Sequence, residues 1–259
     1  MPTADAVLEV ATFGRGAPVT VFAHGLAGSI TETRPLASGV PGTRVLFHFR
    51  GHGRSVVRRP PGGWGYAALA GDLRAVADAA GATRALGVSM GGGALLRLLA
   101  DTPDRFERLV LFLPSLLDGR WDETAAAHYG ALAQRAEAGD RDSVETLLRT
   151  ELPPEVRDLP DARRWAAGRA AALLGGRTDR LLRVLPPPEP PLPSRARLRR
   201  VRAPVLVLAQ ERDPLHPVAV ARELAAALPQ ARLEVFDRGA ALWTGRARLR
   251  GLLTSFLAG

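Results

Sequence analysis

Residues Leu86–Gly93 read LGVSMGGG, and this stretch decides the fold of the chain. The apolar run Thr83–Leu86 leads into it, and Ala94–Ala100, with leucines at helical spacing, leads out of it. The stretch therefore fits the pattern G-x-S-x-G in the setting it requires, which is a strand, a sharp turn and a helix. So tight a turn brings its flanking residues together, where glycine alone avoids a clash. We expect Ser89 on a strained turn, with its hydroxyl exposed above a helix N-terminus that favours negative charge.

The composition excludes several kinds of chemistry. The chain has 259 residues, which is enough for one α/β domain with a sizeable core. It has no cysteine, so disulfides, thiolate metal sites and a cysteine nucleophile are excluded. All 35 basic residues are arginine, so the chain offers no Walker A loop, Schiff base or Ser-Lys dyad.

The charge pattern does not indicate a nucleic-acid or membrane partner. The net charge is +9, but arginine is spread through every segment and accompanies an excess of Ala, Gly and Pro, which is typical of codon bias. No window of 18 uninterrupted apolar residues occurs, so we expect no membrane span. Met1–Val7 lacks the basic and apolar regions of a signal peptide. Together with the absence of cysteine, this predicts a cytoplasmic protein.

Hydrophobic periodicity predicts a mostly parallel α/β sheet flanked by helices, with an all-helical insertion. Strands are expected at 6–13, 19–23, 43–49, 83–88, 109–113, 205–209 and 233–236, and helices at 31–39, 66–80, 94–100, 218–228 and 247–257. Between 121 and 185 the pattern predicts helices alone, at 122–138, 141–150, 161–174 and 177–185. A proline-rich return linker at 186–193 follows. The predicted domains are an α/β core, 1–114 with 203–259, and a helical cap, 115–202.

With these motifs in place, the chain resembles the α/β-hydrolase fold superfamily, among its serine esterases, lipases and thioesterases with a helical cap. The resemblance covers residues 6–114 and 203–258. Four motifs carry it: His24-Gly25 resembles the oxyanion loop, Arg50–Ser55 the loop after the next strand, Gly87–Gly92 the nucleophile elbow, and Glu211–Pro217 the segment that carries the acid.

The resemblance implies a role for each matching residue. Ser89 would be the nucleophile, and Asp213 would orient and support an imidazolium. The backbone N–H groups of Leu26 and Met90 would form the oxyanion hole, each contributing about 3 kcal/mol in the transition state. His24 and Gly25 would shape the oxyanion loop. The resemblance implies neither a cofactor nor a metal ion.

The sequence departs from the family at the third member of the triad. The family's histidine follows the strand here at 233–236, where Ala240 occupies the expected position, and residues 217–259 contain no histidine. Loss of one triad member lowers the rate by roughly 10⁴- to 10⁶-fold. The sequence therefore predicts an intact pocket with impaired turnover, whether Ala240 is native or an engineered inactivation. The alternative is His216 as a surrogate base, since it follows Asp213 by three residues; otherwise His216 packs against Pro217 at a helix start.

Other residues of suitable chemistry fit structural roles better. His48 and His52 lie on a strand end and a glycine loop rather than on a helix, so their spacing does not predict a metal site. Ser55 and Ser115 lie outside any elbow and are expected to cap loops. Asp118, which follows the strand at 109–113, is an alternative acid or a turn residue.

These observations predict a hydrolase that acts on a small, largely apolar ester, thioester or lactone through Ser89. The expected partner is a small molecule held between core and cap, and the oligomeric state stays open. Two other functions fit the same residues: a non-catalytic pseudohydrolase that binds a ligand, and a lyase or cyclase that uses the pocket and the oxyanion hole. Fold alone does not choose among them.

Overall fold

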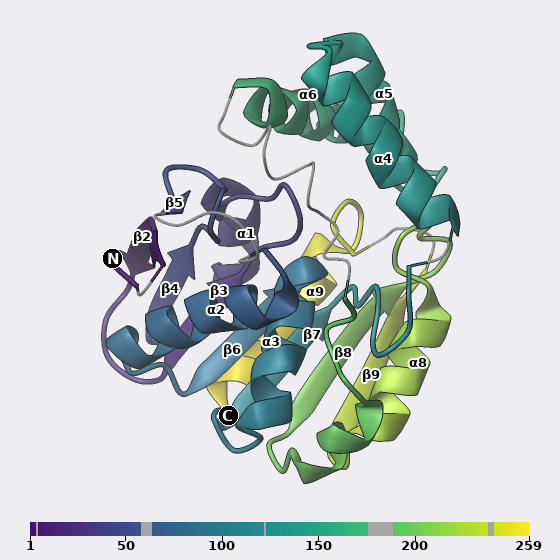
Figure 1. The fold of residues 1–259 in the computed structure, drawn as a ribbon. Coiled ribbons are helices and arrows are strands. Elements are labelled where there is room, and N and C mark those ends of the chain that lie inside the picture. Colours follow the sequence, from purple (N-terminus) through teal and green to yellow (C-terminus); the bar gives the residue numbers. More distant parts are fainter. Residues whose placement is uncertain (4, 58–63, 122, 176–188, 238–240) are drawn as a thin grey trace.

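The central feature of the computed structural model is a seven-stranded sheet in the order β2-β4-β3-β6-β7-β8-β9 (Figure 1). The structure describes residues 1–3, 5–57, 64–121, 123–175, 189–237 and 241–259. The strands of the sheet are β2 (Val10–Phe13), β3 (Val19–Ala23), β4 (Thr43–Phe47), β6 (Arg84–Val88), β7 (Arg108–Phe112), β8 (Val205–Gln210) and β9 (Ala231–Phe236). Strand β2 pairs antiparallel with β4, and the other pairs of this sheet are parallel. Strands β1 (Ala6–Val7) and β5 (Val56–Val57) form a separate antiparallel ribbon. The predicted fold class is confirmed.

Helices cover both faces of this sheet because its strands are apolar on both sides. In β3, Val21 belongs to the buried cluster on the face covered by α2 (Tyr66–Ala80), α3 (Met90–Asp101) and, farther along the sheet, α8 (Val218–Ala227). Its neighbour Phe22 faces the opposite way and packs with α1 (Ile30–Ala37) and α9 (Arg246–Ala258). The alternation follows from the two-residue period of a strand.

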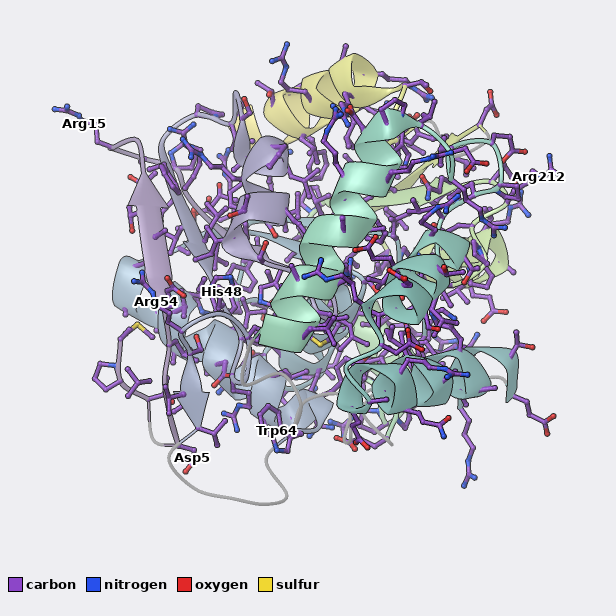
Figure 2. The ribbon with its side chains drawn as sticks, turned by 90° about the horizontal axis from the view of Figure 1, so that it is seen from above. Asp5, Arg15, His48, Arg54, Trp64 and Arg212 are labelled. Atoms are coloured by element: carbon purple, nitrogen blue, oxygen red, sulfur yellow. The ribbon has the colours of Figure 1, made fainter. Side chains whose placement is uncertain are left out.

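Three helices lie together beyond the carboxyl ends of the parallel strands (Figures 1 and 2). They are α4 (Glu123–Glu137), α5 (Arg141–Thr150) and α6 (Pro160–Gly175), and we call them the α4–α6 segment. These helices were predicted within a few residues of their bounds. The helix predicted at 177–185, and the linker up to residue 188, lie outside the described residues. The chain returns through a short 3₁₀ helix, η1 (Arg195–Arg200). No helix in the described ranges is both long enough and apolar enough to cross a membrane.

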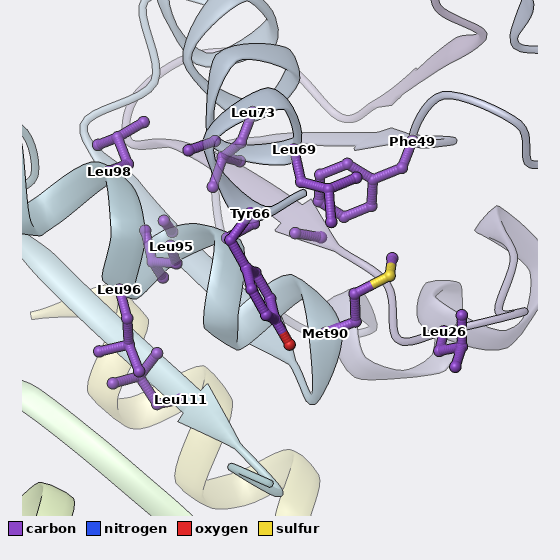
Figure 3. Close-up of a cluster of buried hydrophobic side chains, with 14 of the residues drawn as sticks. Leu26, Phe49, Tyr66, Leu69, Leu73, Met90, Leu95, Leu96, Leu98 and Leu111 are labelled. Carbon is purple, nitrogen blue, oxygen red and sulfur yellow. The ribbon is translucent and has the colours of Figure 1, made fainter. Parts of the chain in front are cut away.

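The turn between β6 and α3 leaves no space for a side chain at Gly87 or Gly91. Ser89 has φ 48° and ψ −110°. A Cβ atom on Gly87 would lie 2.6 Å from the carbonyl oxygen of Gly91, and one on Gly91 would lie 2.5 Å from that of Ala23. A Cβ on Gly93 would lie 2.3 Å from the ring of Tyr66, which points from α2 toward α3 (Figure 3). The predicted sharp turn is therefore present, and close backbone packing makes glycine necessary.

This packing predicts a large difference between two Gly→Ala substitutions. Gly91→Ala forces a methyl group against backbone and should lower the free energy of unfolding by about 1–3 kcal/mol or more. Gly130→Ala lies on α4, where nothing approaches within 4 Å, and should raise it by roughly 0.5–1 kcal/mol. Urea unfolding of both variants measures the difference. Similar values for the two variants would contradict the packing argument.

Candidate active site

Ser89, His216 and Asp213 form a continuous chain of hydrogen bonds. Oγ of Ser89 lies 2.9 Å from Nε2 of His216, and Nδ1 of His216 lies 2.9 Å from Oδ1 of Asp213. Ser89 is supplied by the β6–α3 turn, and the other two residues by the loop between β8 and α8. With the proton of neutral His216 on Nδ1, the imidazole donates to Asp213 and accepts the hydroxyl proton of Ser89.

A tight turn at Asp213 brings His216 back over the carboxylate. Oδ1 of Asp213 accepts hydrogen bonds from the backbone N–H groups of Leu215 and His216, each at 3.0 Å. This is the local bond pattern that aspartate favours in turns. Oδ2 accepts a bond of 2.6 Å from Nε2 of Gln210. Burial would raise the pKa of Asp213, but the adjacent His216 and the hydrogen bonds from His216, Gln210 and Leu215 outweigh it and lower the pKa. The group is therefore a carboxylate at neutral pH.

This geometry differs from the expectation that no base lies near Ser89. The position assigned to the missing histidine, Ala240, lies outside the described residues. The structure instead brings the surrogate His216 within hydrogen-bond distance of the hydroxyl. The physical reason is the turn at Asp213, which places the side chain three residues later beside its own carboxylate. The contact of Gln210 with Asp213 is not predicted from the sequence. The one available signal is that Gln210 is polar and ends the apolar strand β8.

The two residues predicted to supply an oxyanion hole, Leu26 and Met90, lie in segments next to this serine. Met90 is the first residue of α3, where N–H groups have no acceptor within the helix. Leu26 lies in a turn that is closed by a 3.0 Å bond from the N–H of Gly28 to the carbonyl of Gly25. We call residues 25–28 the oxyanion turn. It passes close to Ser89, since a Cβ on Gly25 would lie 3.6 Å from the Cβ of Ser89.

Three buried histidines tie the oxyanion turn and the start of α1 to the loop after β4. In each ring, Nε2 accepts a hydrogen bond from a backbone N–H. His24 accepts from Phe49 at 3.1 Å, His48 from Ile30 at 3.0 Å and His52 from Ala27 at 3.1 Å. The Nδ1–H groups donate to the carbonyl of Gly25, the carboxylate of Glu9 and the carbonyl of Arg50, respectively. Every ring nitrogen is thus engaged, and each ring must be neutral to make its pair of bonds. In the described ranges, no group of three or more His, Cys, Asp or Glu residues could hold a metal ion.

The other polar candidates are engaged elsewhere. Asp118, the alternative acid, lies 2.7 Å from the guanidinium of Arg195. The hydroxyl of Ser55 donates to the carbonyl of His48 and accepts from the N–H of Glu9, as a loop residue does. These contacts leave the Ser89, His216 and Asp213 cluster as the candidate catalytic centre.

A cavity of about 860 Å³ opens beside Ser89 and His216. Helices α1 and α9 line one part of it with Leu36, Leu249 and Leu253. Another part is lined by Tyr129 of α4, Leu152 after α5 and Trp165 of α6. Trp165 packs edge-on against Trp243, which follows β9, with ring centroids 6.3 Å apart. The cavity therefore lies between the sheet and the α4–α6 segment, and its lining is mostly apolar.

Charged groups also reach the cavity. Glu32 on α1 and Arg169 on α6 line it, with Oε2 and Nη1 separated by 3.7 Å. Burial raises the pKa of Glu32, and the nearby Glu151 adds to this effect, while Arg169 opposes it. His128, on α4, pairs with Glu151 at 3.1 Å.

A sequence model of the family described as alpha/beta hydrolase fold matches residues 18–242. The chain belongs to this family. One hundred of its residues are 36% identical to a Caulobacter segnis protein named "Putative carbamate hydrolase RutD"; the match covers 37% of this chain and 38% of the relative. Among solved structures, the esterase EaEST from Exiguobacterium antarcticum has a TM-score of 0.79 at 18% identity, covering 97% of this chain and 96% of its own. An enol-lactonase from Burkholderia xenovorans LB400 has a TM-score of 0.78 at 20% identity, with the same coverage of both chains. These structural likenesses show the shared fold.

The buried rings of His24 and His52 predict that this chain loses stability in mild acid. Burial lowers the pKa of His52 from 6.5 to about 3 in the folded chain, and burial lowers the pKa of His24 well below its usual value. The unfolded chain takes up these two protons at a higher pH than the folded chain does. The contribution of these two histidines to the free energy of unfolding is therefore fully present above about pH 6.5. Below that pH, the free energy of unfolding falls by about 1.4 kcal/mol per pH unit for each histidine.

Urea unfolding between about pH 7 and pH 5 measures this slope. Carboxylates contribute mainly at lower pH, since their ordinary pKa values lie near 4. His52→Gln, whose amide oxygen can still accept the N–H of Ala27, should lose about 1.4 kcal/mol per pH unit of the dependence. A pH-independent free energy of unfolding over this interval would show that the rings titrate in the folded chain as they do in the unfolded chain.

Proposed function

We propose that this chain is a serine hydrolase that cleaves a small, largely apolar ester, thioester or lactone, with Ser89 as nucleophile and His216 as general base. One observation carries the proposal: a single imidazole lies 2.9 Å from the Ser89 hydroxyl and 2.9 Å from the Asp213 carboxylate. A serine hydroxyl is a weak nucleophile until a base accepts its proton. This arrangement favours turnover over the impaired or purely binding function that a missing base would leave.

The reaction proceeds in two halves. His216 Nε2 accepts the Ser89 proton as Oγ attacks the substrate carbonyl carbon, and the carbonyl oxygen becomes an oxyanion held by the N–H groups of Leu26 and Met90. The intermediate collapses, the bond to the leaving group breaks, and His216 returns its proton to that group. Water then attacks the acyl-enzyme with His216 again as base, which releases the acid and restores Ser89. Asp213 stays ionised throughout and stabilises the imidazolium.

The cavity supports a substrate of modest size and low polarity. Its volume of about 860 Å³ lies in the usual range for small-molecule sites. Leu36, Leu249, Leu253 and two tryptophans would hold an alkyl or aryl group next to Ser89. We take residues 115–202 as a cap, because Tyr129, Leu152 and Trp165 cover the cavity from above the sheet. A carbamate has the same electrophilic carbonyl, and the relative named for carbamate hydrolysis adds that class to the substrates to be tested.

His216→Gln should lower kcat for a p-nitrophenyl ester by roughly 10³- to 10⁵-fold, because it removes the base without removing the pocket. Ser89→Ala should lower kcat to a similar extent, and a fluorophosphonate probe should label the wild-type protein but neither variant. The matched control is His128→Gln, since His128 pairs with Glu151 rather than with Ser89. Equal activity of His216→Gln and wild type would refute His216 as the base, and products formed without water incorporation would indicate the lyase or cyclase alternative.

The substitution Ala240→His also tests the assignment of His216 as the base, by restoring a histidine where the family carries one. If His216 already serves Ser89, an imidazole at the position where the family carries its histidine has no proton to accept, and kcat should change by less than about threefold. The measurement is ester hydrolysis by wild type and Ala240→His at one pH. A rise of several orders of magnitude would show that the base was absent and that His216 does not perform the role.

A further inference from the structure

Helix α6, which lines the cavity, also contacts the oxyanion turn. Arg169, on α6, donates a hydrogen bond from Nη2 to the carbonyl oxygen of Leu26. Its guanidinium lies over the ring of Trp165, 5.0 Å from the centroid, and its side chain is 14% exposed. Leu26 is the residue whose own N–H is proposed to hold the oxyanion. A residue 143 positions away in the sequence therefore binds the turn on which that N–H depends.

The oxyanion turn holds Ala27 in a left-handed backbone conformation. The turn spans residues 25–28, and Ala27 has φ 52°, whereas Leu26 is not among the residues with positive φ. A positive φ at the second central residue alone defines a type II turn, which favours glycine or asparagine there. Rotation of the peptide between Leu26 and Ala27 would convert the turn to type I, in which alanine takes an ordinary negative φ.

Two hydrogen bonds oppose that rotation, one at each end of the same peptide. The carbonyl of Leu26 accepts from Arg169, and the N–H of Ala27 donates to Nε2 of His52 at 3.1 Å. His52 is itself held by the loop after β4, whose Arg50 forms a buried pair with Asp72 at 2.7 Å. The support from His52 is thus part of the core, whereas the support from Arg169 depends on the position of α6.

We propose that Arg169 is a positioning residue for the oxyanion hole. By holding the carbonyl of Leu26, it anchors the residue whose N–H would hold the oxyanion and keeps the oxyanion turn in its type II form while α6 lies against the core. The inference rests on the proposed serine-hydrolase function. It adds that the α4–α6 segment takes part in the chemical step as well as in covering the substrate.

The spacing of contacts along α6 separates this role from simple docking. Asp161, Trp165 and Arg169 are four residues apart and share one helix face. Asp161 pairs with Arg246 at 3.1 Å, and Trp165 packs against Trp243. These two contacts hold the N-terminal half of α6 against α9 and the residues after β9. Loss of Arg169 should therefore release the turn while these two contacts hold α6 in place.

The central variant is Arg169→Met, which keeps an unbranched apolar side chain but removes the donor. It should lower kcat for a p-nitrophenyl ester by about 10- to 100-fold, with KM changed by less than about threefold. Affinity for phenylboronic acid, which forms a tetrahedral adduct with serine, should fall by a similar factor. The matched control is Arg163→Met on the same helix, whose side chain is 62% exposed and pairs with Asp158. It should behave like wild type.

A second substitution distinguishes positioning from substrate binding or folding. Glycine adopts positive φ without strain, so Ala27→Gly should stabilise the type II turn without help from α6. In the Arg169→Met background it should restore most of the lost kcat. Failure of Ala27→Gly to restore kcat, or an increase in KM in place of the fall in kcat, would overturn the proposal.

Hydrogen exchange of the Ala27 amide, measured by NMR, tests the positioning without using activity. Exchange should accelerate at least tenfold in Arg169→Met and remain slow in Arg163→Met. If wild type hydrolyses esters and Arg169→Met matches it in both kcat and exchange, the inference fails while the proposed function stands. If wild type is inactive, the proposed function fails, and exchange at Ala27 still decides whether Arg169 holds the turn.

Discussion

The close approach of backbone around Ser89 is the constraint on which the rest of the site depends. The N–H of Ser89 donates to the carbonyl of Phe112 in β7, and its carbonyl accepts from Gly93 in α3, each at 2.9 Å. With Gly87 and Gly91 packed against neighbouring carbonyls, the serine cannot shift without disturbing the centre of the sheet. The strained backbone is therefore fixed by its surroundings. Every other group in the site must be brought to this one hydroxyl.

Two loops meet that requirement in different ways. The loop after β8 is held by its own hydrogen bonds. The carboxylate of Asp213 accepts the backbone N–H groups of Leu215 and His216, and this orients His216. Within the loop after β3 lie its turn bond and the bond from Nδ1 of His24 to the carbonyl of Gly25, and neither holds Leu26 directly. This loop relies on three histidines that connect it to the loop after β4 and on Arg169 from α6. One side of the site is thus stabilised locally, and the other by contacts between segments far apart in the sequence.

This contrast explains what the sequence could and could not predict. The elbow, the strands and most helices follow from signals within a dozen residues, such as the glycines around Ser89 and the apolar run of β8. The proximity of His216 to Asp213 was visible as a spacing of three residues, but its contact with Ser89 depends on how β8 and β6 are placed by β7. The contacts of Arg169 with Leu26 and of Gln210 with Asp213 depend on tertiary packing, for which the sequence carries no local pattern.

Placing Asp213 and His216 in one turn changes what the remaining loop can do. The segment after β9, where the family's histidine was expected, contributes Leu242 and Trp243 to the cavity. If His216 supplies the base, that segment need not hold an imidazole within hydrogen-bond distance of Ser89, and its side chains can be chosen for contact with substrate. In return, position 213 tolerates less change, because Asp213 makes two kinds of bond. Its Oδ1 both caps the turn and receives the proton-bearing nitrogen of His216, so a change there would displace the base as well as remove its charge partner. The distance between acid and base is thus set by local bonds, and tertiary packing has to fix the distance from His216 to Ser89 alone.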